Sequence, residues 1–217
     1  MNILFLVICL SLCIVDKYKR QIVHKMEKSL KGTRTEQNLL KAFVVESQTR
    51  NRYEFFAKVA KDEGYQQIAS IFQKTADQEK QHAKHFFKFL EGGEVKITAT
   101  FSAGKIGTTI ENLRSAVHGE YDEWSVLYPE YSEVAKAEDF GEVVVAFKMI
   151  SRVEFEHERK FKKLIQNLEE GKVFQKEDTV RWVCSNCGFV HEGLFALDKC
   201  PACYHPRAFF EIEKENY

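Results

Sequence analysis

Two stretches of the chain carry the same pair of metal-binding side chains at the same spacing. Glu79 and His82 stand three residues apart, and so do Glu154 and His157. Residues three apart on a helix lie on one face, so each glutamate and its histidine can bind in the same metal region. Carboxylates combined with imidazoles are suited to iron or manganese. The repeat therefore predicts a metal site to which two helices each contribute a Glu-x-x-His pair.

Three further glutamates occupy apolar stripes in the same way: Glu46, Glu120 and Glu123. Any one of them could lie at the edge of the core and reach solvent. Burying all five carboxylates without cations would cost on the order of several kcal/mol per charge, and two divalent ions would offset most of that charge. One glutamate from each of two helices, with Glu-x-x-His from two others, is the ligand set of di-iron carboxylate bundles. The combination therefore favours two metal ions.

Two tyrosines share the faces of the lone glutamates. Tyr53 lies seven residues after Glu46, and Tyr128 lies eight residues after Glu120. Their hydroxyls could hydrogen-bond the carboxylates that hold the metals, or their rings could be ordinary core aromatics. The spacing leaves both interpretations open. The two histidines that fall off the stripes are expected at the surface: His85 and His118.

The cysteines near the C-terminus predict a second metal site. Cys184, Cys187, Cys200 and Cys203 form the pattern C-x2-C-x12-C-x2-C. Four thiolates on two such knuckles make a tetrahedral site. The segment 178–217 is too short for a good core of its own, so the metal must help to hold it. The spacing does not distinguish zinc from iron, but a redox-active di-metal site on the same chain favours iron.

Long helices are needed to position these residues. Four are expected, over about 35–62, 65–91, 108–137 and 140–170. Thr33 and Glu36 match a capping box at the first start, and Gly171 follows the last end. Pro129 lies inside the third helix, where it should kink the helix or leave a local gap in its hydrogen bonds.

Each helix carries an apolar stripe that includes the candidate ligands, which is typical of the core seam of a bundle. In the second helix the stripe is Ile68, Phe72, Thr75, Glu79, His82, Phe86 and Phe89. In the third it is Leu113, Val117, Glu120, Glu123, Leu127, Tyr131 and Val134. In the fourth it is Phe147, Ile150, Glu154, His157, Phe161, Leu164 and Leu168.

The connection between the second and third helices, 92–107, is long enough to cross the bundle. The second helix would be roughly 40 Å long at about 1.5 Å per residue. Roughly fourteen extended residues reach about 46 Å at about 3.3 Å each. The connection can therefore form the crossover found in ferritin-like folds.

Composition agrees with a helical, globular protein. The 217 residues include 32 Lys plus Arg and 32 Asp plus Glu, so the net charge is zero, which gives no support to nucleic-acid binding. Hydrophobic residues make up 44%, with 18 Phe, enough for a sizeable core. Only 3 prolines occur, none before Pro129, which favours helices over an all-β fold.

The N-terminal segment, 1–25, stands apart. Residues 3–15 form an apolar run with the length of a signal-peptide core, whereas a membrane-spanning helix needs about 20 residues. No Lys or Arg precedes the run, and Met26 begins a stretch typical of a cytoplasmic N-terminus. We therefore expect a leader, a weak anchor or an over-extended start, with no membrane span and a cytoplasmic protein. Cys9 and Cys13 are not expected to be ligands.

Several motifs together resemble the rubrerythrin family, from about Met26 to Tyr217. They are ESQTRNRY at 46–53, TADQEKQHAK at 75–84, FKFLEGG at 87–93, GEYDE at 119–123, EFEH at 154–157, WVCSNCG at 182–188 and CPACYHP at 200–206. The resemblance implies a mainly α protein with a ferritin-like four-helix bundle over 26–172 that holds two irons. A small rubredoxin-like metal-binding β domain over 178–217 would follow and bind one iron.

The resemblance also implies the residues of both sites. The di-iron ligands would be Glu46, Glu79, His82, Glu120, Glu123, Glu154 and His157, and the single iron would be held by Cys184, Cys187, Cys200 and Cys203. Glu79 and Glu154 would bridge the irons, and one iron would exchange Glu123 for His82 on reduction. Tyr53 and Tyr128 match family tyrosines that hydrogen-bond the site.

The implied activity is peroxidase: reduction of hydrogen peroxide to water in oxidative stress defence. Electrons would come from NAD(P)H through a separate reductase or rubredoxin, and the chain would form a homodimer. The alternatives are a ferroxidase or iron-handling ferritin-like protein, and a zinc-ribbon binding module on a structural bundle. The chain departs from the family pattern at Tyr121, Asp122 and Trp124, often histidine or tyrosine in relatives, and at Tyr204, where simple rubredoxins have glycine.

Overall fold

The computed structural model describes residues 28–215. The expectations for residues 1–25, including Cys9 and Cys13, therefore lie outside the described residues. The chain divides after Lys31, and the helices and strands of the described residues belong to the unit that begins at Gly32. Among the described residues, no helix is long and apolar enough to cross a membrane.

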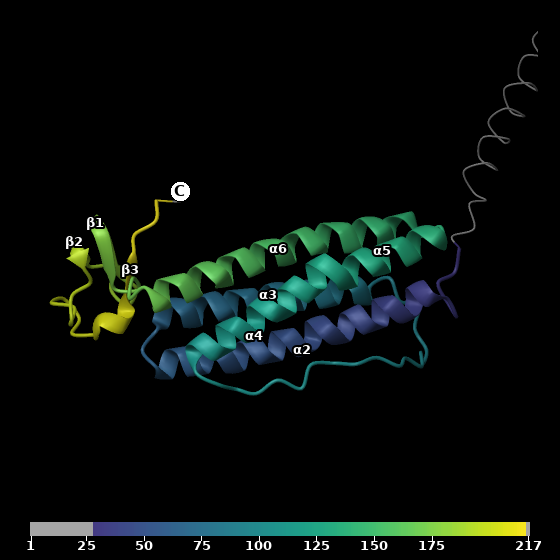
Figure 1. The fold of residues 1–217 in the computed structure, drawn as a ribbon, viewed down its shortest axis with the longest axis horizontal. Coiled ribbons are helices and arrows are strands. Elements are labelled where there is room, and N and C mark those ends of the chain that lie inside the picture. Colours follow the sequence, from purple (N-terminus) through teal and green to yellow (C-terminus); the bar gives the residue numbers. More distant parts are fainter. Residues whose placement is uncertain (1–27, 216–217) are drawn as a thin grey trace, which may run out of the picture. The chain divides into compact units, whose positions relative to one another are not determined.

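Long helices come first in this unit, and a small sheet comes after them (Figure 1). The helices are α2 (Arg34–Asp62), α3 (Gln66–Phe87), α4 (Thr109–Asp122), the π-helical turn η1 (Glu123–Leu127), α5 (Tyr128–Ala137) and α6 (Gly141–Glu169). Because α4, η1 and α5 continue one another, they form a single rod (Figure 1). The described residues thus contain the four-helix bundle that the sequence predicts.

The end of α3 differs from the expectation of about residue 91. The helix stops at Phe87, and the next turn tightens: the N–H of Phe89 bonds the carbonyl of Phe86 at 3.2 Å, and that of Leu90 bonds Phe87 at 3.1 Å. Such bonds to the third preceding residue are a common way to close a helix end. The left-handed Gly92 (φ 78°) therefore comes after this turn and does not itself end the helix.

The expected capping of the first helix is present, with one difference. The Thr33 hydroxyl accepts a bond from the Glu36 N–H at 3.0 Å, but the Glu36 carboxylate accepts from the Gly32 N–H at 2.8 Å. A reciprocal capping box occurs instead at the start of α4, between Thr108 and Glu111.

The two halves of the bundle also cap each other. Glu138, just after α5, accepts bonds from the Thr35 N–H at 2.8 Å and from the Arg34 N–H at 3.2 Å, at the start of α2. Glu63, just after α2, accepts a bond from the Thr109 N–H at 3.1 Å, at the start of α4. Carboxylates at these positions satisfy free N–H groups and match the positive end of the helix dipole.

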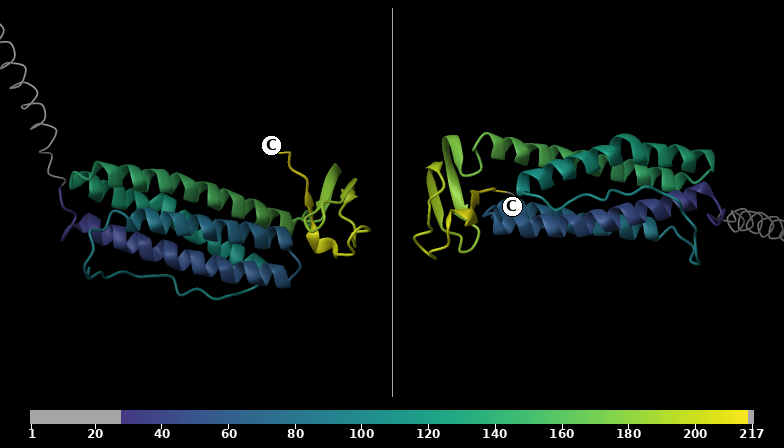
Figure 2. Two further views of the ribbon diagram at one scale, coloured as in Figure 1. Left: turned by 180° about the vertical axis from the view of Figure 1, so that it is seen from behind. Right: turned by 60° about the horizontal axis from the view of Figure 1, so that its bottom comes forward.

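The connection from α3 to α4 forms the predicted crossover. It runs along the bundle from the end of α3 to the start of α4 at the opposite end (Figures 1 and 2). The Gln48 side chain on α2 donates a hydrogen bond to the Ser102 carbonyl at 2.6 Å, which ties the connection to the bundle.

The π turn changes which residues of the third rod face the core. The expected residues Leu127, Tyr131 and Val134 are only half-buried, whereas their next neighbours are buried: Tyr128, Ser132 and Ala135. The stripe prediction was wrong by one position after Glu123. The reason is that the Tyr128 N–H bonds the carbonyl of Glu123, five residues back, so the turn takes one extra residue and rotates the helix beyond it.

Two aromatic layers fill the core on either side of the Glu-x-x-His pairs. On one side Phe72 and Phe161 lie 5.2 Å apart between ring centroids, and on the other Phe86 and Phe147 lie 5.0 Å apart. In both α3 and α6 the candidate ligands lie in sequence between these two aromatic residues. The polar pairs are therefore enclosed by apolar packing, which excludes water and strengthens electrostatic interactions.

The C-terminal part is a three-stranded antiparallel sheet in the order β2-β1-β3. Its strands are β1 (Gln175–Cys184), β2 (Val190–Phe195) and β3 (Phe210–Ile212), with the short helix η2 (Arg207–Phe209) before β3. The core is small and contains Trp182, Cys184, Ala196, Cys200 and Phe210. The sheet is the small β domain that the sequence predicts, and two of the four cysteines are part of its core.

Candidate metal centres

Six carboxylate and imidazole side chains converge inside the bundle as two overlapping groups. The first is Glu46, Glu79, His82 and Glu154, and the second is Glu79, Glu120, Glu154 and His157. The ligand atoms of each group lie within 4.8 Å of one another. Glu79 and Glu154 belong to both groups, which is the arrangement needed for two cations that share two bridging carboxylates.

The two histidines face the shared carboxylates in matching ways. His82 Nδ1 lies 2.8 Å from Glu79 Oε2 and 2.9 Å from Glu154 Oε1. His157 Nδ1 lies 3.0 Å from Glu79 Oε1 and 2.9 Å from Glu154 Oε2. The Nδ1 atom of each histidine therefore lies close to one oxygen of each shared carboxylate.

Gln78 contacts the cluster, which the sequence pattern did not predict. Its Oε1 lies 3.1 Å from His157 Nε2, the nitrogen that points away from the cluster. A partner of this kind makes Nε2 the protonated nitrogen and leaves Nδ1 free to bind a cation. Gln78 lies off the apolar stripe, so its position gave no signal before the structure placed α6 beside α3.

The polar atoms of the cluster fit cations. Several buried side-chain atoms have no hydrogen-bond partner: Oε2 of Glu46, Oε1 of Glu79, Oε2 of Glu120, both carboxylate oxygens of Glu154 and Nδ1 of His157. These side chains are at most 2% exposed. Buried polar atoms are nearly always satisfied, and two divalent ions at this place would satisfy all of these. The donor set thus fits a pair of metal ions.

The protonation equilibria of the cluster agree with this fit. Burial raises the pKa of Glu46 well above its ordinary value, and it raises the pKa of Glu120 to about 8. Burial would also raise the pKa of Glu79, but the adjacent imidazoles of His157 and His82 lower it to about 2. Protons shared among these groups balance the buried charge, and metal binding would displace them.

Both tyrosines hydrogen-bond the cluster, each across the bundle. The Tyr53 hydroxyl donates to Glu120 Oε1 at 2.5 Å, and the Tyr128 hydroxyl donates to Glu46 Oε1. Each tyrosine therefore bonds the glutamate of the other half and not the one on its own helix. Burial raises the pKa of both phenols well above 10, which keeps them as donors.

Glu123 stands apart from the other expected ligands. Its side chain is 5% exposed, and its Oε2 atom is buried without a hydrogen-bond partner. Glu123 nevertheless belongs to neither ligand group, whereas His82 belongs to the first. The structure thus brings six of the seven expected di-iron ligands together and leaves Glu123, on the π turn, beside them.

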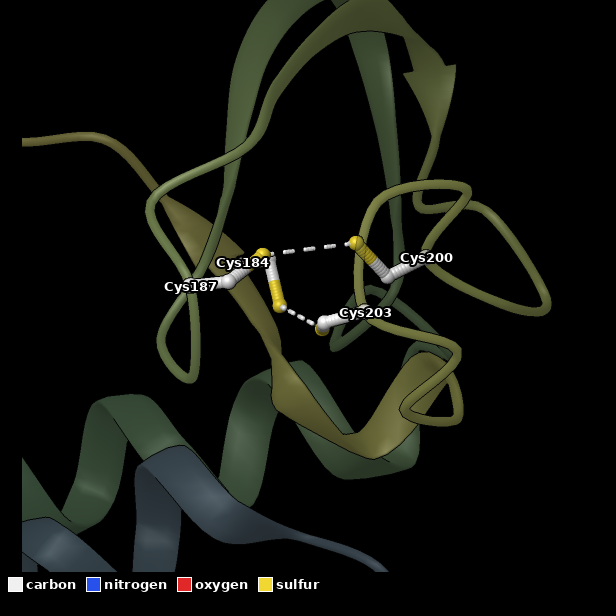
Figure 3. Close-up of side chains that lie close together, drawn as sticks. All are labelled: Cys184, Cys187, Cys200 and Cys203. Carbon is white, nitrogen blue, oxygen red and sulfur yellow. Dashed lines mark hydrogen bonds between the residues drawn. The ribbon is translucent and has the colours of Figure 1, made fainter.

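The four cysteines form the second centre (Figure 3). The sulfurs of Cys184 and Cys203 are 3.7 Å apart, and those of Cys187 and Cys200 are 3.6 Å apart. A tetrahedral site with metal–sulfur distances of about 2.3 Å requires sulfur–sulfur separations of about 3.8 Å, whereas a disulfide bond is about 2.05 Å long. The four thiols are free and suit one tetrahedral ion.

The two cysteine knuckles share one turn geometry. The Gly188 N–H bonds the Cys184 carbonyl at 2.8 Å, and the Tyr204 N–H bonds the Cys200 carbonyl at 2.9 Å. Both residues have a left-handed backbone conformation, with φ values of 78° and 62°. This conformation costs glycine nothing, but it strains the backbone of tyrosine by roughly 1–2 kcal/mol.

The backbone N–H of His205 lowers the pKa of the Cys203 thiol to about 6.

A crossover four-helix bundle with this carboxylate–histidine cluster, joined to a tetracysteine sheet, defines a ferritin-like di-iron protein with a rubredoxin-like domain. The family model for rubrerythrin matches residues 37–165, and that for the rubrerythrin rubredoxin-like domain matches residues 182–211. The chain belongs to the rubrerythrin family. Its bundle cluster is accordingly a di-iron site, and its four cysteines could bind one iron.

Close relatives support this membership along most of the chain. A rubrerythrin of Porphyromonas gingivalis is 53% identical over 89% of this chain and 96% of its own length. A rubrerythrin of Clostridium perfringens is 50% identical over 88% of this chain and 100% of its own. Among solved structures, mixed-valence nigerythrin is similar with a TM-score of 0.55, 27% identity and coverage of 88% of this chain and 90% of that one.

Proposed function

We propose that this chain is a non-haem di-iron peroxidase that reduces hydrogen peroxide to water in oxidative stress defence. The observation that carries the proposal is that one chain has two different groups of side chains, one of carboxylates and imidazoles and one of four thiols, each of which could hold iron. The proposed iron ligands are Glu46, Glu79, His82, Glu120, Glu123, Glu154 and His157 in the bundle, and Cys184, Cys187, Cys200 and Cys203 in the sheet. A ferroxidase would have no use for the cysteine centre.

The bundle residues would hold the irons and restrict access to them. When bound, two ferrous ions supply the two electrons that cleave an O–O bond and polarise the substrate as Lewis acids. Glu79 and Glu154 would bridge them. The ligand carboxylates are at most 5% exposed, whereas the His82 side chain is 13% exposed. A substrate must therefore be small, as peroxide is, and the side of His82 is the more open approach.

Peroxide reduction also requires two protons, which the buried polar groups can supply. Glu120 accepts the hydrogen bond of the Tyr53 hydroxyl, and Glu46 accepts that of the Tyr128 hydroxyl. Each phenol therefore holds a proton next to a carboxylate that would bind iron, and an O–H group placed in this way can act as a general acid. We assign proton transfer to these two pairs.

The cysteine centre would deliver electrons to the bundle one at a time. Support comes from the match of residues 182–211 to the rubredoxin-like domain. In this proposal NAD(P)H supplies the electrons through a separate reductase or a rubredoxin, and the chain acts as a homodimer in the cytoplasm. The bundle domain would span residues 26–172 and the iron–sulfur domain residues 178–217.

The test is to disable the cysteine centre alone. A Cys184→Ser, Cys187→Ser variant is expected to lose continuous peroxide reduction with NADH and a reductase. It should keep one rapid oxidation when its chemically pre-reduced bundle irons meet peroxide. Ser185→Ala, in the same knuckle, removes only a hydroxyl that bonds the Phe209 carbonyl at 2.9 Å and should keep both reactions. Continued turnover in the cysteine variant would contradict the proposal.

A further inference from the structure

The π turn is tied to α6 by two contacts that involve none of the proposed ligands. The Trp124 indole N–H donates to Glu158 Oε2 at 3.0 Å, and the Ser151 hydroxyl donates to the Trp124 carbonyl at 3.0 Å. Ser151 and Glu158 lie on α6 on either side of the Glu154–His157 pair. We call Trp124, Ser151 and Glu158 together the Trp124 anchor.

The Ser151 contact replaces a backbone bond that this helix cannot make. In a π turn the carbonyl of Trp124 would accept from the N–H five residues on, but that residue is Pro129, which has none. The Tyr128 N–H is already bonded to the Glu123 carbonyl. Without the Ser151 hydroxyl the carbonyl would lose its donor, so the serine stabilises this local geometry.

The Glu158 contact is equally well defined. Glu158 is 3% exposed, and its other oxygen lies 2.6 Å from the Lys162 ammonium. Two edge-on rings hold the indole in place: Tyr121 at 5.4 Å and Phe155 at 5.3 Å between centroids. The indole therefore has both a fixed orientation and a charged acceptor, and such hydrogen bonds are among the stronger ones.

Glu123 precedes Trp124 directly, and its own carboxylate offers little to fix it. Its Oε2 has no hydrogen-bond partner, and the side chain is outside both ligand groups. The position of Glu123 must then be set by its backbone, which is the π turn that the anchor holds against α6.

We propose that the Trp124 anchor is a positioning device for Glu123: it sets how readily this carboxylate reaches the adjacent iron. The inference rests on the proposed assignment of Glu123 as a ligand. Trp124, Ser151 and Glu158 touch neither metal nor substrate, and they act only through the π turn. Loss of an anchor contact should loosen the turn and weaken iron binding, while the six converging ligands stay in place.

The experiment measures the rate at which ferrous iron leaves the bundle of the fully loaded protein to an excess of chelator. The visible absorption of the cysteine-bound iron is followed separately. Trp124→Phe keeps an aromatic ring but removes the N–H donor, and Ser151→Ala removes the other contact. Each is expected to speed release by about tenfold, as loss of groups that support metal ligands commonly does. Amide hydrogen exchange over 123–128 should also become faster.

Two comparisons make the result decisive. Ser47→Ala is the matched control, because its hydroxyl also donates to a helix carbonyl, that of Phe43 at 2.6 Å, but on α2. It should leave the release rate unchanged. In a Glu123→Gln background, Trp124→Phe should add nothing, since the anchor acts through Glu123.

The outcomes separate the two proposals. If Glu123→Gln alone leaves iron release unchanged, the assignment of Glu123 as a ligand fails, and the anchor fails with it. If Glu123→Gln speeds release but the effect of Trp124→Phe is fully additive to it, the anchor is structural only and the inference is overturned. Unchanged release in both Trp124→Phe and Ser151→Ala overturns it as well.

Discussion

The first half of the bundle, α2 with α3, and the second half, α4 to α6, supply matching groups to the cluster. Glu79 and His82 match Glu154 and His157 at a separation of 75 residues. Tyr53 and Tyr128 are also 75 apart and bond across the bundle, each to the glutamate of the other half. A pair of bridged cations needs two similar ligand sets, and a duplicated helix pair provides them.

The halves differ at one place, the π turn. Glu46 and Glu120 are 74 residues apart, so the second half gains one residue between Glu120 and Tyr128. At the matching buried position, 74 residues apart, the first half has Thr49 and the second has Glu123. The symmetric part of the site thus comes from the regular helices, while the one additional carboxylate comes with a local irregularity.

The cysteine centre is also built from two similar units that differ at one residue. Its two knuckles share the same backbone bond and left-handed turn, but Gly188 is matched by Tyr204. Tyr204 is 71% exposed, and the Lys199 ammonium lies over its ring at 4.8 Å from the centroid. In both centres a repeated unit forms the metal site, and one copy carries a substitution that the repeat alone does not require.

Substitutions of the two shared carboxylates should have the largest effects, and the two effects should be equal. Glu79→Ala and Glu154→Ala are each expected to lose both bundle irons, because each side chain belongs to both ligand groups. The iron content per chain, measured by elemental analysis, should fall equally in the two variants, while the cysteine-bound iron remains. Glu156→Ala, on the exposed face of α6, is the control. Retention of a bundle iron in either variant, which would leave about two irons per chain, would contradict this prediction.

Substitutions of the two tyrosines should have smaller effects, and both should lower the stability by the same amount. Tyr53→Phe and Tyr128→Phe each remove one buried hydrogen bond to a carboxyl group, which should lower the free energy of unfolding by about 1.5–3 kcal/mol. Urea denaturation of the metal-free protein measures this. If the two variants differ by far more than about 1 kcal/mol, the two halves do not use their tyrosines alike.

The two carboxylates that cap helices across the bundle should contribute unequally to stability. Glu138 accepts three bonds from Arg34 and Thr35, whereas Glu63 accepts one from Thr109. Glu138→Ala is therefore expected to lower the free energy of unfolding by about 1–2 kcal/mol, and Glu63→Ala by less. Urea denaturation of both variants at neutral pH checks the order, and a larger effect of Glu63→Ala would contradict it.

The effect of Glu138 should also depend on pH. Burial acts to raise the pKa of its carboxyl, but hydrogen bonds from Thr35 and Arg34 lower it below the ordinary value. A carboxyl whose folded pKa is lowered stabilises the protein fully above its unfolded pKa, and this stabilisation is lost as the pH falls through the folded value. The difference between wild type and Glu138→Ala should thus shrink below about pH 4. A difference that grows on acidification would be inconsistent with this pairing.

The knuckles should give the smallest effect. Tyr204→Gly relieves a strained left-handed residue but adds chain flexibility, so it should raise the free energy of unfolding by at most about 1 kcal/mol. Gly188→Ala should lower it by a similar amount. Thermal loss of the iron–cysteine absorption band monitors both variants. Destabilisation by Tyr204→Gly would mean that the contact of the tyrosine ring with the Lys199 ammonium outweighs the backbone strain.

The ligands could be predicted from the sequence because they occupy the same helical periodicity as the apolar core. Glu79 and His82, like the cysteines of the C-x2-C pairs, have a spacing whose geometry is local. The π turn could not be predicted in the same way, although Pro129 marked its neighbourhood. The Trp124 carbonyl in this turn accepts a hydrogen bond from the Ser151 hydroxyl, which lies in another helix.

Hydrogen-bond partners on different helices could not be predicted from the sequence for the same reason. The stripe placed Tyr53 on the face of Glu46, but which glutamate accepts its hydroxyl depends on how the two halves pack. Gln78 became visible only once α6 lay next to α3. Contacts within a helix arise from periodicity, whereas contacts between helices arise from the assembled bundle.

The most direct test of the central claim, that one chain holds a di-iron peroxidase site and its own one-iron electron centre, is metal analysis of anaerobically purified protein combined with its visible spectrum during peroxide addition. We predict about three irons per chain, as expected for a carboxylate bundle plus a tetracysteine site. We also predict a red chromophore that bleaches on reduction and returns when peroxide is added. One zinc and no iron per chain, with no visible absorption, would contradict the account.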